Sequence, residues 1–126
     1  MLVVDDEEKV LSLITRVLNE SGYEAIGISN PLLALTRVEQ GERFDLAVLD
    51  VVMPEMSGES LAASLRHHDP DLPVLYVTGY DEALFQARPV LWERESFLEK
   101  PFTPAALREA VAMALWGSTS KPPANG

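Results

Sequence analysis

Three acidic side chains stand where apolar segments of this chain end. Asp5 and Asp6 follow the apolar residues 1–4, and Asp50 closes a second apolar run over residues 44–49. Like charges about 4 Å apart repel by roughly 1 to 4 kcal/mol at effective dielectric constants from 80 down to 20. A fold tolerates such a cluster where a cation binds, and oxygen ligands without histidine or cysteine favour Mg²⁺. The three acids therefore predict a magnesium site at the rim of a sheet.

A simpler interpretation exists for the first two acids. Asp5 and Asp6 could merely cap the helix that follows them, because helix N-termini favour acidic side chains. Asp50, which comes from a separate apolar run, favours the metal site instead.

A hydroxyl and a cation stand at the ends of two further apolar runs. Thr78 ends the run over residues 72–78, and Lys100 follows residues 96–99 and precedes Pro101. Taken singly, such a threonine is usually a strand former or cap, and such a lysine is usually a solvated surface residue. Together with the acids they supply an acceptor, a metal site, a hydrogen-bond donor and a cation, which are the groups that phosphoryl transfer requires.

The elements that must position these groups alternate along the chain. Apolar runs predict five strands: residues 1–4, a short strand within residues 24–29, and residues 44–49, 72–78 and 96–99. Apolar residues at helical spacing predict the intervening helices: one ended by Gly22, one opened by Asn30-Pro31, one capped by Ser57, one over residues 81–88 that stops at Pro89, and one opened by Thr103-Pro104.

This alternation predicts an α/β fold with a doubly wound parallel sheet. Continuous apolar strands indicate a sheet buried on both faces, which requires helices on each side. In such sheets ligands bind beyond the carboxyl ends of the strands, and that is where the acids, Thr78 and Lys100 stand.

Length, charge and composition narrow the class of protein. The 126 residues fit one domain, which we place at residues 1–116, with a Ser/Pro/Gly-rich tail over 117–126 that we expect to be disordered. The formal net charge of -10 argues against nucleic acid and anionic membranes as partners. The absence of cysteine excludes disulfides and thiolate metal sites. No apolar run reaches the roughly 20 residues of a membrane span, and no basic leader is present, so we expect a cytoplasmic protein.

Four motifs make the sequence recognisable. In order they are Leu2-Val3-Val4-Asp5-Asp6-Glu7, Asp50-Val51-Val52-Met53-Pro54-Glu55-Met56-Ser57-Gly58, Tyr76-Val77-Thr78-Gly79 and Phe97-Leu98-Glu99-Lys100-Pro101-Phe102. With these motifs the chain resembles the receiver domain of two-component response regulators over nearly its whole length. The resemblance implies a flavodoxin-like fold of five strand–helix units with the strand order 2-1-3-4-5.

The same resemblance implies a role for each matching residue. Asp50 corresponds to the phosphoacceptor. Asp6, Asp50 and the Val52 carbonyl correspond to direct Mg²⁺ ligands, with Asp5 acting through water. The remaining matches are the switch hydroxyl, the switch aromatic, the phosphoryl-binding lysine and the cis-proline after it, which here are Thr78, Phe97, Lys100 and Pro101.

The function indicated is a signalling module that accepts a phosphoryl group from a histidine kinase or phosphotransfer protein and changes conformation. We expect it not to be an enzyme. Its parent protein could be a kinase, because Thr78-Gly79-Tyr80 and residues 97–104 look like the receivers of hybrid histidine kinases. Two alternatives are a pseudo-receiver that binds partners without phosphorylation and a small phosphohydrolase. The phosphohydrolase commonly needs a second acid two residues after the nucleophile, where this chain has Val52.

Overall fold

A five-stranded parallel sheet forms the centre of the molecule. The structure, a computed structural model, describes residues 1–79 and 95–116. The strands lie in the order β2-β1-β3-β4-β5, and every neighbouring pair is parallel. Their bounds are β1 Leu2–Val4, β2 Ile26–Ile28, β3 Ala47–Asp50, β4 Val74–Thr78 and β5 Glu95–Glu99. The fold class and the strand order are therefore the expected ones.

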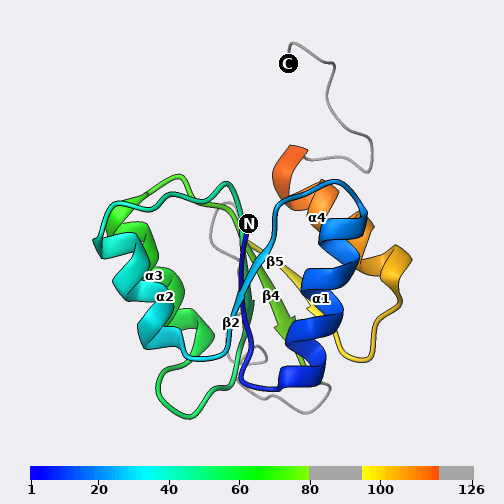
Figure 1. Ribbon diagram of the computed structural model, residues 1–126, viewed down its shortest axis with the longest axis horizontal. Helices are drawn as coiled ribbons and strands as arrows, with labels where there is room; N and C mark the ends of the chain where they lie inside the picture. Colours follow the sequence, from blue (N-terminus) through cyan, green and yellow to red (C-terminus); the bar gives the residue numbers. More distant parts are fainter. Residues whose placement is uncertain (80–94, 117–126) are drawn as a thin grey trace.

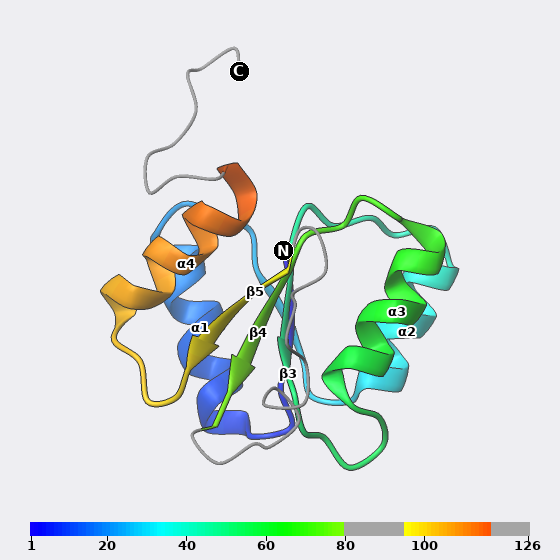
Figure 2. The same ribbon diagram turned by 180° about the vertical axis from the view of Figure 1, so that it is seen from behind.

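Helices cover both faces of this sheet (Figures 1 and 2). Helices α1 (Glu8–Glu20) and α4 (Pro104–Trp116) pack on one face, and α2 (Pro31–Glu39) and α3 (Gly58–His68) pack on the other. Successive strand residues point to opposite faces, so each strand feeds two separate apolar cores. Val3, Val48 and Val77 pack under α1 and α4, whereas Val4, Leu49 and Tyr76 pack under α2 and α3.

Within the described residues, the predicted helix starts at Asn30, Ser57 and Thr103 and the stop at Gly22 are present. The side chains of Asn30, Ser57 and Thr103 accept hydrogen bonds from the backbone N–H groups of Leu32, Ser60 and Ala106, at 2.9, 3.1 and 3.1 Å. These bonds satisfy donors that a helix start otherwise leaves unpaired. Gly22, with φ of 95°, follows the last turn of α1 in the left-handed conformation that favours glycine.

Three strands are shorter than the apolar runs that predict them. Met1 precedes β1, residues 44–46 precede β3, and residues 72 and 73 precede β4, whereas β2 is the short strand expected within residues 24–29. Leu46 is fully buried although it lies before the strand, because the core extends past the end of the hydrogen-bonded ladder. Apolar character therefore marks burial, and only the backbone pairing marks the strand.

Several expectations fall beyond what the structure covers. The predicted helix over residues 81–88 with its stop at Pro89, and the expected tail over 117–126, lie outside the described residues. The domain boundary after residue 116 therefore stays a prediction. Among the helices that the structure describes, none is long and apolar enough to cross a membrane.

Candidate functional site

Four strands deliver polar side chains to one edge of the sheet. Asp5 follows β1, Asp50 is the last residue of β3, Thr78 is the last residue of β4, and Lys100 follows β5. Asp5, Asp50 and Thr78 are only 1%, 3% and 6% exposed. Polar groups in a core cost free energy unless they have partners. Their gathering at one edge marks a site rather than a core.

The three predicted acids form one cluster. Asp5, Asp6 and Asp50 each place a carboxylate oxygen within 4.8 Å of the others. Asp6 is exposed, whereas Asp5 and Asp50 are buried. One oxygen of Asp5, Oδ1, accepts a hydrogen bond from the backbone N–H of Glu7 at 2.9 Å. The bond fixes the Asp5 carboxylate and leaves its second oxygen directed elsewhere.

That second oxygen, Asp5 Oδ2, is buried and has no hydrogen-bond partner among the described residues. Burial raises the pKa of Asp5 above its ordinary value of 3.8, and the Glu7 amide and the Lys100 ammonium lower this pKa in part. A buried carboxylate oxygen without a donor is poorly placed unless a cation approaches it.

Lys100 provides a cation that is already in place. Its Nζ lies 3.4 Å from Asp5 Oδ2, 3.4 Å from Asp50 Oδ1 and 3.3 Å from Glu7 Oε1. Burial alone would lower the pKa of Lys100, but the charges of Asp5, Asp50 and Glu7 outweigh it and raise this pKa above 10.5. The lysine is therefore a fixed positive charge at neutral pH. Glu7, which the sequence analysis did not single out, could have been suspected only from its position directly after the acid pair.

The backbone holds Lys100 at this edge. Its N–H donates to the Thr78 carbonyl at 2.7 Å, which joins the ends of β4 and β5. The Lys100–Pro101 peptide bond is cis, as the family resemblance implies. The Thr78 hydroxyl donates to the Gly79 carbonyl at 3.1 Å.

The donor set fits Mg²⁺. Three carboxylates without histidine or cysteine are hard oxygen ligands, and one of their oxygens, Asp5 Oδ2, is buried with the Lys100 ammonium as its charged neighbour at 3.4 Å. Val52, whose carbonyl is a further expected ligand, lies in the loop directly after Asp50 with its side chain 57% exposed.

A glycine that the sequence analysis quoted only as part of a motif supports this loop. The Gly58 N–H donates to the Val51 carbonyl at 2.8 Å, and Gly58 is buried. A Cβ at Gly58 would overlap the carbonyl oxygen of Asp50 and would lie 3.0 Å from its carbonyl carbon. The first residue of α3 therefore touches the backbone of Asp50, and only glycine fits there without a shift.

The predicted switch aromatic, Phe97, lies two residues before the end of β5. Phe97 of β5 is the register partner of Tyr76 of β4, and the two rings stack with centroids 5.4 Å apart at 25°. Phe97 is half-buried against the core under α2 and α3. The structure thus gathers the acids, Thr78, Lys100 and Pro101 at the edge, with Phe97 beside them.

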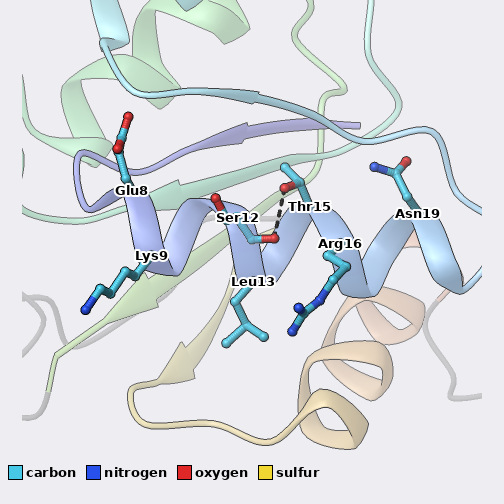
Figure 3. A pocket seen from close by; sticks show the side chains of 7 residues that line it. All are labelled: Glu8, Lys9, Ser12, Leu13, Thr15, Arg16 and Asn19. Atoms are coloured by element: carbon cyan, nitrogen blue, oxygen red, sulfur yellow. Dashed lines mark hydrogen bonds between the residues drawn. The ribbon is translucent and has the colours of Figure 1, made fainter.

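Two surface depressions lie along α1 and contain none of the three acids. The larger is lined by seven residues of that helix, drawn in Figure 3, where Thr15 donates to the Ser12 carbonyl at 3.1 Å. The smaller and more apolar one borders Lys100 and is lined by Val10, Leu13, Lys100, Pro101 and Phe102. The larger has Glu8, Lys9 and Arg16 on its surface, but neither contains buried carboxylates, so the acidic edge stays the candidate.

Comparisons with known proteins find related sequences and a related fold. A sequence model described as the response regulator receiver domain matches residues 1–112. The alkaline phosphatase synthesis transcriptional regulatory protein PhoP of Bacillus subtilis (strain 168) is 34% identical over 115 residues, which cover 91% of this chain and 48% of PhoP. The sensor kinase CckA of Brucella abortus (strain 2308) is 36% identical over 104 residues, which cover 82% of this chain and 11% of that kinase. This chain therefore spans about half of PhoP and a small part of CckA.

A solved structure has the same fold. The crystal structure of a response regulator receiver protein from Sinorhizobium medicae WSM419 superposes with a TM-score of 0.80 at 28% identity. The match covers 94% of each chain.

Proposed function

The chain belongs to the response regulator receiver domain family of two-component signalling, and we propose that its Asp50 accepts a phosphoryl group from a phosphohistidine. One Asp50 carboxylate oxygen attacks phosphorus, and the bond between phosphorus and the donor imidazole nitrogen breaks. The electron pair of that bond stays on the imidazole, so an acyl phosphate forms on this chain. The observation that supports this best is a buried carboxylate, Asp50, 3.4 Å from the Lys100 ammonium at the edge of the sheet.

The neighbouring acids are less suited to act as the nucleophile. Asp5 is oriented by the Glu7 amide, and its second oxygen faces Lys100 3.4 Å away, which suits a ligand or a ligand held through water. Asp6 is exposed, which suits a direct metal ligand at the rim. Asp50 belongs to the acid cluster and has an oxygen 3.4 Å from Lys100 Nζ, so both a bound Mg²⁺ and the Lys100 ammonium would reach its phosphoryl group.

Each remaining residue has a role in this proposal. Bound Mg²⁺ would neutralise charge on the phosphoryl oxygens, and Asp6, Asp50 and the Val52 carbonyl would hold it, with Asp5 acting through water. Lys100 pairs with a phosphoryl oxygen as a fixed cation. The Thr78 hydroxyl, which donates to Gly79 in this structure, turns to donate to another phosphoryl oxygen.

The output is a change of conformation rather than catalytic turnover. Movement of the Thr78 hydroxyl alters the packing beside it, and Phe97 and Pro101 at the end of β5 respond, so phosphorylation shifts a two-state equilibrium. The phosphoryl donor is a cytoplasmic histidine kinase or a phosphotransfer protein. The similarity to CckA makes the receiver of a hybrid kinase the second candidate for the parent protein.

Treatment with acetyl phosphate and Mg²⁺ tests the proposal. Mass spectrometry should find one added phosphate on the wild-type chain and none on Asp50→Asn, which keeps the shape of the side chain and removes the nucleophile. Asp45→Asn, the same change at an acid whose side chain is 71% exposed, is the matched control and should be labelled fully. Equal labelling of Asp50→Asn would refute the assignment of Asp50. Release of phosphate over many turnovers would indicate a phosphohydrolase, and no labelling of any form would indicate a pseudo-receiver.

A further inference from the structure

Three residues from different elements meet in a buried polar cluster beneath the proposed switch. Glu95 Oε2 accepts a hydrogen bond from the Tyr76 hydroxyl at 2.8 Å and another from Arg66 Nη1 at 3.0 Å. Arg66 also donates through Nε to the Leu72 carbonyl at 3.0 Å. The cluster therefore ties α3, β4 and β5 together, along with the segment between α3 and β4. Its members are separated by 19 and 29 positions in the sequence.

The side chains of this cluster are largely removed from water, which limits the arrangements in which its charges are paired. The side chains of Glu95 and Arg66 are 3% and 17% exposed, and Tyr76 is 1% exposed. Removing two charges from water costs free energy that their attraction repays only with good geometry and additional hydrogen bonds. Here both donors converge on one Glu95 oxygen. Such a cluster contributes less to net stability than to fixing one arrangement of the three elements.

The cluster includes one residue on β4 and one on β5, each two positions before a proposed switch residue. Tyr76 and Thr78 are two positions apart on β4, and Glu95 and Phe97 are two positions apart on β5, so each pair points to the same face of the sheet. The Tyr76 ring also stacks on the ring of Phe97. One side chain, Tyr76, thus contacts Phe97 through its ring and Glu95 through its hydroxyl.

The conformational change on phosphorylation would have to disturb the contacts of this cluster. In this structure the Thr78 hydroxyl donates to the Gly79 carbonyl, so it must turn away from that partner to donate to a phosphoryl group on Asp50. The turn changes the packing beside Thr78 on the face that Tyr76 and Phe97 share. As long as Glu95 and Arg66 fix the Tyr76 hydroxyl, the Tyr76 ring and the Phe97 ring stacked on it cannot shift freely.

We propose, on the premise of the proposed function, that Arg66, Glu95 and Tyr76 are positioning residues that hold Phe97 in its unphosphorylated position and so oppose the switch. The cluster touches neither the metal site nor the phosphoryl group. It acts by lowering the population of the activated arrangement. A ligand that binds only the activated arrangement then binds more weakly in proportion to that population.

Beryllofluoride, a phosphoryl mimic that binds Asp50 with Mg²⁺, measures this population. Its half-saturating concentration, determined by calorimetry at saturating Mg²⁺, should fall about three- to tenfold in Tyr76→Phe, which removes only the hydroxyl. Arg66→Met should give the same direction, and Arg66→Lys, which keeps the charge, should lie between Arg66→Met and the wild type. Val111→Ala is the control: it opens a fully buried site on α4 in the other core, and its half-saturating concentration should not change.

The comparison separates the two hypotheses. If the wild type does not bind beryllofluoride, or if Asp50→Asn binds it equally well, the proposed function fails. If the wild type binds and Tyr76→Phe and Arg66→Met bind with wild-type affinity or more weakly, the positioning role is wrong and the proposed function stands. A parallel shift in Val111→Ala would assign the effect to general loosening of the fold and would also overturn the positioning role. Urea melts of each variant confirm that it is folded at the temperature of the titration.

Discussion

Replacing Lys100 by methionine removes the cation from the acidic edge and nearly keeps the side-chain length. Lys100 Nζ lies 3.4 Å from both Asp5 and Asp50, whose side chains are 1% and 3% exposed. Removing one partner of a buried ion pair costs about 3–5 kcal/mol because an uncompensated charge remains. Lys100 itself is 18% exposed and the site opens at a rim, so we expect a loss in free energy of unfolding of about 2–4 kcal/mol at pH 7 without Mg²⁺.

The loss should depend on pH with a defined sign. The pKa of Asp5 is already raised above 3.8 in the folded protein, and removal of Lys100 raises it further. A carboxyl group with a raised folded-state pKa favours the folded state fully below pH 3.8, and this contribution is lost as the pH rises through the folded-state pKa. The difference between Lys100→Met and the wild type should therefore be largest near neutral pH and should shrink toward pH 3.8.

Urea melts with EDTA or with millimolar Mg²⁺ measure both effects. Mg²⁺ brings positive charge to the same carboxylates, so it should stabilise Lys100→Met more than the wild type. Lys9→Met is the matched control, since Lys9 is exposed on α1 and the substitution should change stability by no more than about 0.5 kcal/mol. A Lys100→Met variant as stable as Lys9→Met, or one whose deficit Mg²⁺ leaves unchanged, would refute this account of the site.

Three further substitutions test the loop and the metal ligands. Gly58→Ala should lower the free energy of unfolding by about 1–3 kcal/mol and weaken beryllofluoride binding, because the added Cβ pushes on the Asp50 backbone. Ser60→Ala, two residues further on at an exposed position, is the control in both assays. Asp6→Asn should stabilise the metal-free protein slightly by relieving repulsion and should abolish the stabilisation by Mg²⁺ in urea melts. Val52→Glu should speed the loss of phosphate from labelled protein, because an acid at this exposed position can orient a water molecule; an unchanged or slower loss would contradict that role.

Local sequence signals predict most of the fold because each acts over a few residues. Asn30, Ser57 and Thr103 each cap a helix through a backbone N–H two or three positions ahead, and such bonds leave a readable signature. Apolar runs likewise mark the buried strands. The strand order came from the family resemblance, since alternation alone leaves several doubly wound orders open.

The candidate site could be predicted in part, for the same reason. An acid at the end of an apolar run is visible in the sequence, and parallel strands bring such ends to one edge. The cluster of Arg66, Tyr76 and Glu95 has no such signature, because it depends on tertiary contacts between residues 19 and 29 positions apart. The packing of Gly58 against the Asp50 backbone could not be predicted either, because the sequence shows a glycine but not the backbone that lies close to it.

The strand order divides the site into two parts, one on central strands and one on an edge strand, which should open at different free energies. The acids stand on β1 and β3, which have strands on both sides, whereas Lys100 follows β5, the outer strand of the described sheet. Residues of β1 and β3 are buried throughout, and those of β5 are half-buried or exposed. Opening of an edge strand needs less free energy than opening of the centre. Brief detachment of β5 would carry away the cation and the aromatic ring and leave the acids assembled. If Mg²⁺ binds as proposed, it would stay bound during excursions in which Lys100, the proposed partner of the phosphoryl group, and Phe97, the proposed switch aromatic, have moved away.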